Sequence, residues 1–227
     1  MRLPHSPALQ PVHAQRSSTF SRLQTCFRAL RYERILLYGH STGGLEATLL
    51  LRESRHRERI SALVLNSPLL DWGEGGVNEM LLDGMDDGIF SLIKAVKGDD
   101  AEEYPIKTAS EPGNYGATLA IQYPSIHLRC RNLGGKVTAG WARAVSAMQA
   151  ELREKAPSTE VPTLLLHTKS DVVLDGPELG RLAHLVSEDV TTREVKWCRH
   201  DMLMNYTAED NDRVLAYMLE WLAKTCA

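Results

Sequence analysis

The sequence predicts an α/β protein built on a parallel sheet with one helical insert. Three unbroken apolar runs, at residues 35–38, 60–65 and 163–167, carry this prediction, because such runs are typical of strands that a parallel sheet buries on both faces. A helical pattern lies between the first two runs, and a long stretch with no convincing strand separates the second from the third. Strands that alternate with helices favour this fold class over an all-helical or all-β one.

The amino-terminal part is predicted to hold one helix and one βαβ unit. Apolar side chains repeat at helical spacing across residues 17–30. The strand at 35–38 is followed by a helix with Leu45 and Leu49 on one side, and then by the strand at 60–65. A strand, a helix and a strand in about 30 residues form a βαβ unit, whose crossover is expected to be right-handed.

Residues 73–159 are predicted to form a helical cap. The stretch opens with glycines, has a middle rich in proline and glycine, and contains no convincing strand. Helical spacing recurs at 77–96, and a second amphipathic stripe ends before Pro157. This stripe consists of Val137, Trp141, Val145, Met148 and Leu152. We therefore expect an irregular arm at 1–16, a core at 17–72 and 160–227, and a cap at 73–159.

Strands and helices alternate again towards the carboxyl terminus. After the strand at 163–167 we expect a helix at 177–186 and a weaker, more polar strand at 191–198, near an edge of the sheet. A capping box at 207–210 starts the closing helix. Its predicted buried stripe consists of Val214, Met218, Trp221 and Leu222.

The composition is that of a globular protein. Of 227 residues, 43% are apolar and 24% are charged, which excludes a disordered or fibrous chain. The net charge of −3 is too close to zero to favour nucleic acid or an anionic membrane as a partner. No apolar run approaches the roughly 18 residues that would span a bilayer. The four cysteines are far apart and form no CxxC pair, so we expect reduced thiols and a cytoplasmic protein.

The sequence Gly39-His40-Ser41-Thr42-Gly43 fits the G-x-S-x-G pattern of a nucleophile elbow. The pattern lies between a predicted strand and a predicted helix, which is the context that it requires. A serine on so tight a turn has a strained backbone, and the glycines let the strand and helix approach closely. The backbone N–H of Thr42 would lie at the helix N-terminus, where it could stabilise an oxyanion.

A serine nucleophile needs a histidine base held by a carboxylate. Of the eight histidines, His200 is the best candidate, because it follows the last predicted strand at the carboxyl edge of the sheet. His40 adjoins the serine but is placed wrongly to act as its base, so we expect it to pack locally. His167 ends a strand, and we expect a structural role for it.

Asp171 is the preferred carboxylate, since it lies in the loop after the strand at 163–167. Asp175 competes with it, although the following Gly176-Pro177 suggests a helix N-cap. Asp71 is a third candidate, and Asp201 is disfavoured because its side chain should diverge from that of its neighbour His200. The order serine, aspartate, histidine is that of the α/β-hydrolases.

Four stretches together resemble the α/β-hydrolase superfamily, and most nearly its monoacylglycerol lipase and lysophospholipase-like (serine aminopeptidase-type) branch. They are LLYGHSTGGL, ALVLNSPLLDW, VPTLLLHTKSDVVLD and CRHDML, in family order with a cap-sized gap before the third. The resemblance implies that Ser41 is the nucleophile, Asp171 the acid and His200 the base, with Thr42 supplying one oxyanion N–H. It implies no metal or organic cofactor.

The chain departs from the family ahead of residue 35. Family members carry four more strands and a helix there, with an HG-type loop that supplies a second oxyanion donor, and residues 1–34 contain no counterpart. The strand at 35–38 is therefore expected to be an exposed edge, open to self-association. A truncated gene model, a short variant and a fold completed by a partner all fit this pattern.

The function expected from the sequence is that of a serine hydrolase. Its substrate would be a small-molecule carboxylic ester, such as the acyl lipids monoacylglycerol or lysophospholipid. Two alternatives stay open: a truncated, weak or inactive homologue that acts by binding, and a hydrolase of amides or other acyl groups.

Overall fold

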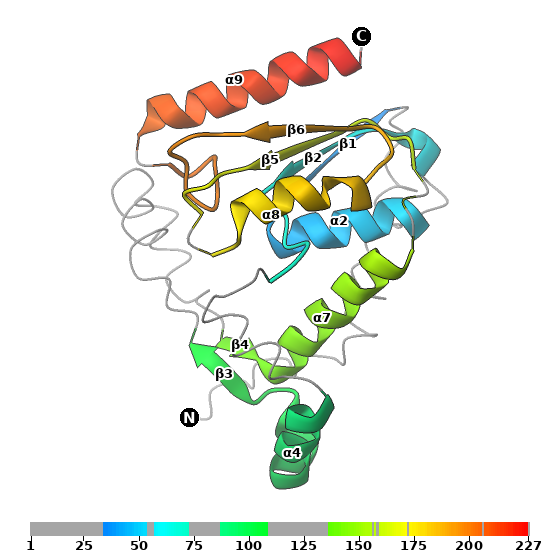
Figure 1. Cartoon of the computed structure of the whole chain (residues 1–227), viewed down its shortest axis with the longest axis vertical. Helices are drawn as coiled ribbons and strands as arrows, with labels where there is room; N and C mark the ends of the chain where they lie inside the picture. The colour runs from blue at the N-terminus through cyan, green and yellow to red at the C-terminus, as the bar shows by residue number, and fades with distance from the viewer. Residues whose placement is uncertain are drawn as a thin grey trace, which may run out of the picture.

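A computed structural model gives the fold of the chain (Figure 1). It describes residues 34–53, 57–72, 87–108, 136–155, 157, 159–171, 173–205 and 207–226. The predicted arm at 1–16 and helix at 17–30 lie outside these residues.

In the described part of the chain, four strands form a parallel sheet at the centre of the fold. Its strand order is β1 (Ile35–His40), β2 (Ile60–Asn66), β5 (Thr163–His167) and β6 (Val190–Glu194). The three predicted apolar runs are thus confirmed as strands, and β6 lies at one edge of the sheet, as expected. All three pairings are parallel, so the carboxyl ends of the strands meet along one edge.

Helices cover both faces of this sheet (Figure 1). On one face lie α2 (Thr42–Glu53) and α8 (Gly176–Arg181), and on the other lies α9 (Ala208–Thr225). Alternating residues of β2 and β5 are buried in two separate cores. Leu63, Leu65 and Leu165 belong to the core with α2 and α8, whereas Val64, Leu164 and Leu166 belong to the core with α9.

Burial on both faces, which the apolar runs predict, holds for β2 and β5 but not for β1, for which the departure from the family predicts an exposed edge. The side chains of Leu36 and Tyr38 on β1 are 52% and 47% exposed. Among the residues that the structure describes, β1 has β2 as its one paired neighbour. An unbroken apolar run therefore does not by itself predict burial on both faces.

Between β2 and β5, the described residues form α4 (Asp87–Lys97), α7 (Ala139–Glu154) and two short strands. The expectation of no strand there is wrong, because β3 (Pro105–Thr108) pairs antiparallel with β4 (Lys136–Thr138). Strands of four and three residues are too short to show a periodic pattern. Four members of the predicted stripe, Trp141, Val145, Met148 and Leu152, are confirmed on the apolar face of α7, whereas Val137 lies in β4.

The last α7 turn is joined to the sheet layer by Arg52 of α2. This guanidinium donates to the backbone oxygen of Leu152 over 3.0 Å and also to that of Leu185. The indole rings of Trp72 and Trp141 meet edge-on at 5.7 Å between centroids, which packs the start of α7 against the segment after β2. Helix α7 is thus packed on the core.

Two carboxyl-terminal elements are shorter than predicted. The helix expected at 177–186 is α8 followed by a 3₁₀ turn, Leu182–Leu185. Strand β6 ends at Glu194 instead of at 198, ahead of a turn in which Trp197 has a φ of 59°. Thr207 caps α9 as predicted, since its hydroxyl accepts from Asp210 N–H at 3.1 Å.

Candidate active site

The elbow after β1 has the strained backbone that its motif predicts. Ser41 has a φ of 53°, a region that side chains other than glycine seldom adopt. Its N–H donates to the Asn66 carbonyl over 3.2 Å, and its carbonyl accepts from Gly44 N–H and Leu69 N–H, both at 2.9 Å. Together with a longer bond from Leu45 N–H to the same carbonyl, at 3.4 Å, these backbone bonds hold the serine at the carboxyl edge of the sheet.

Two glycines make this turn possible. A Cβ built on Gly39 would lie 2.7 Å from the Cα of Gly44, and a Cβ on Gly44 would lie 2.7 Å from the Cβ of Pro68. Such distances are far below van der Waals contact, so neither position has room for a side chain. Thr42 is the first residue of α2, and its N–H therefore lacks a partner within the helix.

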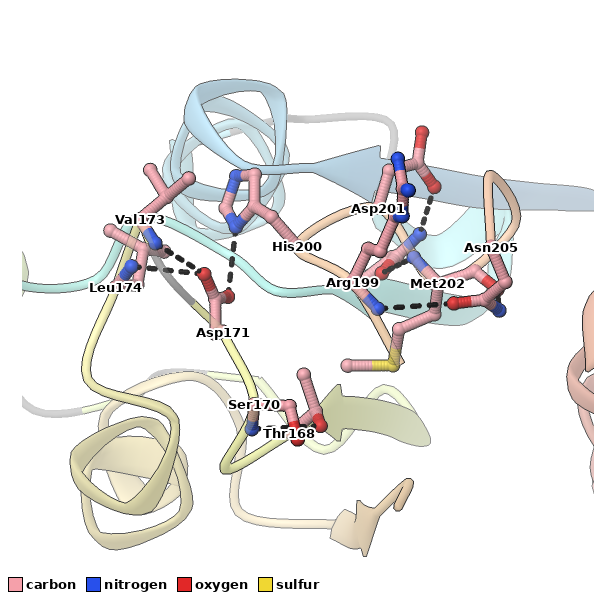
Figure 2. Close-up of polar contacts among 11 residues, drawn as sticks. Thr168, Ser170, Asp171, Val173, Leu174, Arg199, His200, Asp201, Met202 and Asn205 are labelled. Carbon is pink, nitrogen blue, oxygen red and sulfur yellow. Dashed lines mark hydrogen bonds and ion pairs between the residues drawn. The ribbon is translucent and has the colours of Figure 1, made fainter. Parts of the chain in front are cut away.

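Asp171 and His200 form a buried pair at the same edge (Figure 2). Asp171 Oδ2 lies 2.8 Å from His200 Nδ1, and the two side chains are 0% and 4% exposed. The other carboxylate oxygen accepts from the N–H groups of Val173 and Leu174, at 2.8 and 3.0 Å. The carboxylate is thus fixed from both sides, and the second ring nitrogen of His200 points away from it (Figure 2).

The rival carboxylates have other partners. Asp175 caps α8 by accepting from Glu178 N–H at 3.0 Å, which is the role its sequence context predicted. Asp71 accepts from Trp72 N–H and pairs with Arg153 of α7. Among the described contacts, His200 Nδ1 pairs with Asp171 and with none of these alternatives.

His40, the residue before Ser41, packs against His200. The two ring centroids are 4.9 Å apart at an interplanar angle of 57°, and the His40 ring is hydrogen-bonded to the His200 backbone. Burial lowers the pKa of His40, while the carboxylate of Asp201 opposes that shift. His40 is therefore expected to be a neutral neighbour of His200 at pH 7.

Ser41 and His200 come to the same edge, but the described contacts include no hydrogen bond between the Ser41 hydroxyl and the His200 ring. Such bonds are often long in enzymes without substrate and tighten when it binds. The family's HG-type loop has no expected counterpart ahead of residue 35, and residues 1–33 lie outside the described part of the chain. Within that part, no group of three His, Cys, Asp or Glu side chains forms a metal site.

A comparison with protein-family models identifies the family of the chain. The family model described as serine aminopeptidase, S33, matches residues 18–206. The chain belongs to this family of α/β-hydrolases. The resemblance drawn from the four sequence stretches is thereby confirmed, and so is the fold class.

Solved structures share the fold of this S33-family chain. The monoacylglycerol lipase of Paleococcus ferrophilus gives a TM-score of 0.65 at 18% identity, over 98% of this chain and 79% of that one. A soluble variant of the Saccharomyces cerevisiae monoglyceride lipase gives 0.64 at 15% identity, over 91% and 69%. An esterase from Thermogutta terrifontis gives 0.56 at 17% identity, over 98% and 75%. No curated protein matches the chain in sequence.

The sequence analysis of this S33-family chain overlooked Asn66. This residue ends β2 and is 0% exposed, and its side chain is hydrogen-bonded to the loop that carries His200. The signal in the sequence was a polar amide at the end of the mostly apolar strand ISALVLN. Buried amides almost always have partners, so the position could have been marked as a link to another segment.

Proposed function

We propose that this chain is a serine hydrolase that cleaves the carboxylic esters of acyl lipids, such as monoacylglycerol or lysophospholipid. Ser41 is the nucleophile, His200 the general base and Asp171 the carboxylate that orients it. The backbone N–H of Thr42 supplies one oxyanion donor. The printed names of two relatives of the same fold, a monoacylglycerol lipase and a monoglyceride lipase, support the substrate class.

The buried bond between Asp171 and His200 is the observation that carries this proposal. A carboxylate that accepts from Nδ1–H fixes the tautomer in which Nε2 is free to take a proton. The pair lies 2.8 Å apart with almost no solvent access, so water does not weaken the attraction as it would at the surface. The strained backbone of Ser41 supports the same assignment, since such strain gathers at reacting residues.

The reaction follows from these roles. The Ser41 Oγ attacks the ester carbonyl carbon while its proton passes to His200 Nε2, and the carbonyl π electrons move to the oxygen. The N–H of Thr42 stabilises this oxyanion. Collapse of the intermediate breaks the bond to the alcohol, which leaves with the proton from His200. Water then attacks the acyl-enzyme by the same steps and releases the carboxylic acid.

The remaining parts of the proposal concern the organisation and setting of the chain. We assign residues 73–159 to a cap over a core formed by 17–72 and 160–227, which the packing of α7 on α2 supports. The free thiols of Cys198 and Cys226 support a cytoplasmic location. No helix among the described residues has the length and apolar character to cross a bilayer.

Covalent labelling with a fluorophosphonate tests the proposed nucleophile. We expect the folded wild type to be labelled on Ser41, and Ser41→Ala to lose the label completely while it keeps its circular-dichroism spectrum. Thr48→Ala is the matched control, because Thr48 is a buried hydroxyl of α2 that donates to Gly44 O at 2.9 Å. A folded wild type that takes up no label would contradict the proposal.

A substrate panel tests the ester class. We expect kcat/KM to rise with acyl length across p-nitrophenyl esters from acetate to decanoate, because a longer chain buries more apolar surface in the transition state. Aminoacyl p-nitroanilides are the second arm, because the family is described as serine aminopeptidase. Faster cleavage of the anilides than of every ester would favour the amide alternative.

A further inference from the structure

Asn66 is the one fully buried polar side chain of β2 that reaches the His200 loop in the described part of the chain. It is 0% exposed at the carboxyl end of β2, directly opposite His40 in the parallel register. An amide buried so deeply would cost free energy if it were unpaired. Its hydrogen bonds therefore show which segments the fold requires it to join.

The backbone of Asn66 is bonded to the elbow. Its carbonyl accepts from Ser41 N–H at 3.2 Å. This bond continues the ladder between β1 and β2 by one residue, onto the residue whose φ is 53°. The position of the nucleophile is thus tied directly to the end of β2.

The side chain of Asn66 is bonded to the His200 loop. Its Oδ1 accepts from Met202 N–H at 3.2 Å, and its Nδ2 donates to Asp201 Oδ1 at 2.9 Å. The same Nδ2 donates to the hydroxyl of Tyr38 on β1 at 2.8 Å. Both amide hydrogens and the carbonyl are occupied, and a flipped amide would set Nδ2 against the Met202 N–H donor.

We propose that Asn66 is a positioning residue that clamps the nucleophile elbow to the His200 loop, and that Asp201 is its partner in this clamp. The inference rests on the proposed function, because it assigns Asn66 a role through Ser41 and His200. The clamp spans 135 residues of sequence between Asn66 and Asp201. It fixes the distance between two groups that come from separate segments of the chain.

The His200 loop needs such a clamp because it has no regular secondary structure of its own. Residues 198–205 contain neither helix nor strand, so side chains must hold their backbone. Asn205 braces the loop internally by accepting from Arg199 N–H at 3.0 Å and donating to Met202 O at 2.6 Å. Those bonds fix the shape of the loop, whereas Asn66 fixes its place relative to Ser41.

The Tyr38 hydroxyl that accepts from Asn66 is expected to stay neutral across the physiological pH range. Burial raises the pKa of Tyr38 to about 12, and the Asp201 carboxylate acts in the same direction. Tyr38 is therefore a neutral hydroxyl that accepts from Asn66. Asp201 carries the one formal charge among Asn66, Asp201 and Tyr38. Exchanging Asn66 and Asp201 would place that charge on β2 instead of on the His200 loop.

An exchange of the two partners tests the clamp. Asn66→Asp sets a carboxylate against Asp201, so at pH 8 the pair repels and loses its hydrogen bond. We expect kcat for a p-nitrophenyl ester to fall about 10²-fold with KM unchanged, because a displacement of about 1 Å between reacting groups costs that much. The double variant Asn66→Asp with Asp201→Asn reverses donor and acceptor, and kcat should return to within about fivefold of wild type.

Asn66→Leu removes all three side-chain bonds and should lower kcat by about the same factor of 10². Ser187→Ala is the matched control, because Ser187 is 1% exposed and its hydroxyl donates to Val161 O at 2.8 Å, ahead of β5 and far from its carboxyl end. It should lower the melting temperature and leave kcat at the wild-type value.

The outcomes separate the clamp from the proposed function. If the wild type cleaves no ester and takes up no fluorophosphonate, the proposed function fails. If the wild type reacts, the clamp is overturned when Asn66→Asp and Asn66→Leu keep wild-type kcat, or when the double variant is folded and no faster than Asn66→Asp. If Asn66→Asp does not fold, a double variant that folds and recovers kcat supports the clamp, and one that folds and stays about 10²-fold slow overturns it.

Discussion

At the scale of single residues, the contact between Asp171 and His200 supports the proposal that His200 is the base. Three sequence candidates for the carboxylate were open, and the structure gives each a separate partner. Asp171 accepts from the His200 ring, Asp175 caps α8 and Asp71 pairs with Arg153. Exchange of a carboxylate for an amide therefore distinguishes the three by activity.

Asp171→Asn is expected to lower kcat by about 10³ to 10⁴, because the amide no longer holds the reactive His200 tautomer or balances the imidazolium. The measurement is steady-state kinetics with a p-nitrophenyl ester. Asp175→Asn is the matched control, since asparagine caps a helix as well as aspartate does. It should keep wild-type kcat, and a larger loss in Asp175→Asn than in Asp171→Asn would contradict the assignment of the acid.

The residue scale also shows where sequence reasoning stops. Ser41, Asp171 and His200 could be named because each follows a recognisable strand and carries reactive chemistry. Asn66 could not be assigned a role in the same way, because its partners Asp201 and Tyr38 are set by loop geometry and by register between strands. A single sequence contains the residues of such a network but not their pairing.

At the scale of elements, close approach of α2 to the end of β2 is what makes the elbow. Gly43 and Gly44 are neighbours in the same helix turn, yet their surroundings differ. A Cβ on Gly43 would meet nothing within 4 Å, whereas a Cβ on Gly44 would lie 2.7 Å from Pro68. A substitution at Gly43 therefore changes only helix propensity, whereas one at Gly44 also disturbs packing.

Gly44→Ala is expected to lower the free energy of unfolding by about 1–3 kcal/mol, because the added methyl group forces Pro68 and the backbone apart. Gly43→Ala, its matched control, should be neutral or stabilising by up to about 1 kcal/mol, since alanine is the better helix former. Urea denaturation followed by circular dichroism measures both. Equal destabilisation of the two variants would contradict the close packing at Gly44.

The elements that could be predicted are those with a long or uniform pattern. The buried strands β2 and β5 and the stripe of α7 were confirmed because each has a periodicity set by its burial. Strands β3 and β4 were missed because their stability comes from pairing with each other over a few residues. The early end of β6 depends on the turn at Trp197, whose φ of 59° no local pattern indicates.

At the scale of the whole molecule, the buried His167 and the partly buried His40 link folding to pH. Burial is the largest cause of the lowered pKa of both His40 and His167. Near His167, Glu194 opposes the shift and Lys169 adds to it. In the unfolded chain each ring has its ordinary pKa of 6.5, so at mildly acidic pH the unfolded state binds more protons than the folded one.

The lowered pKa values of the two rings make the fold less stable in acid. Stability rises with pH wherever the unfolded state binds more protons, so the contribution of these rings is fully present above pH 6.5 and is lost as the pH falls from there towards the lowered folded-state pKa values. Each ring can add at most about 1.4 kcal/mol per pH unit to the slope. Acidification from pH 7.5 to 5.5 should therefore destabilise the fold.

His167→Asn removes one of the two rings and tests their contribution. Its absolute stability is not the readout, because the substitution also changes packing at the end of β5. The readout is the difference between the free energies of unfolding at pH 7.5 and pH 5.5, from urea denaturation. We expect a smaller difference than in wild type, whereas His184→Asn should leave it unchanged, because the His184 ring is exposed. Equal pH dependence in wild type and His167→Asn would show that the His167 ring does not take part in the linkage, and would leave His40 beside the active site as its source.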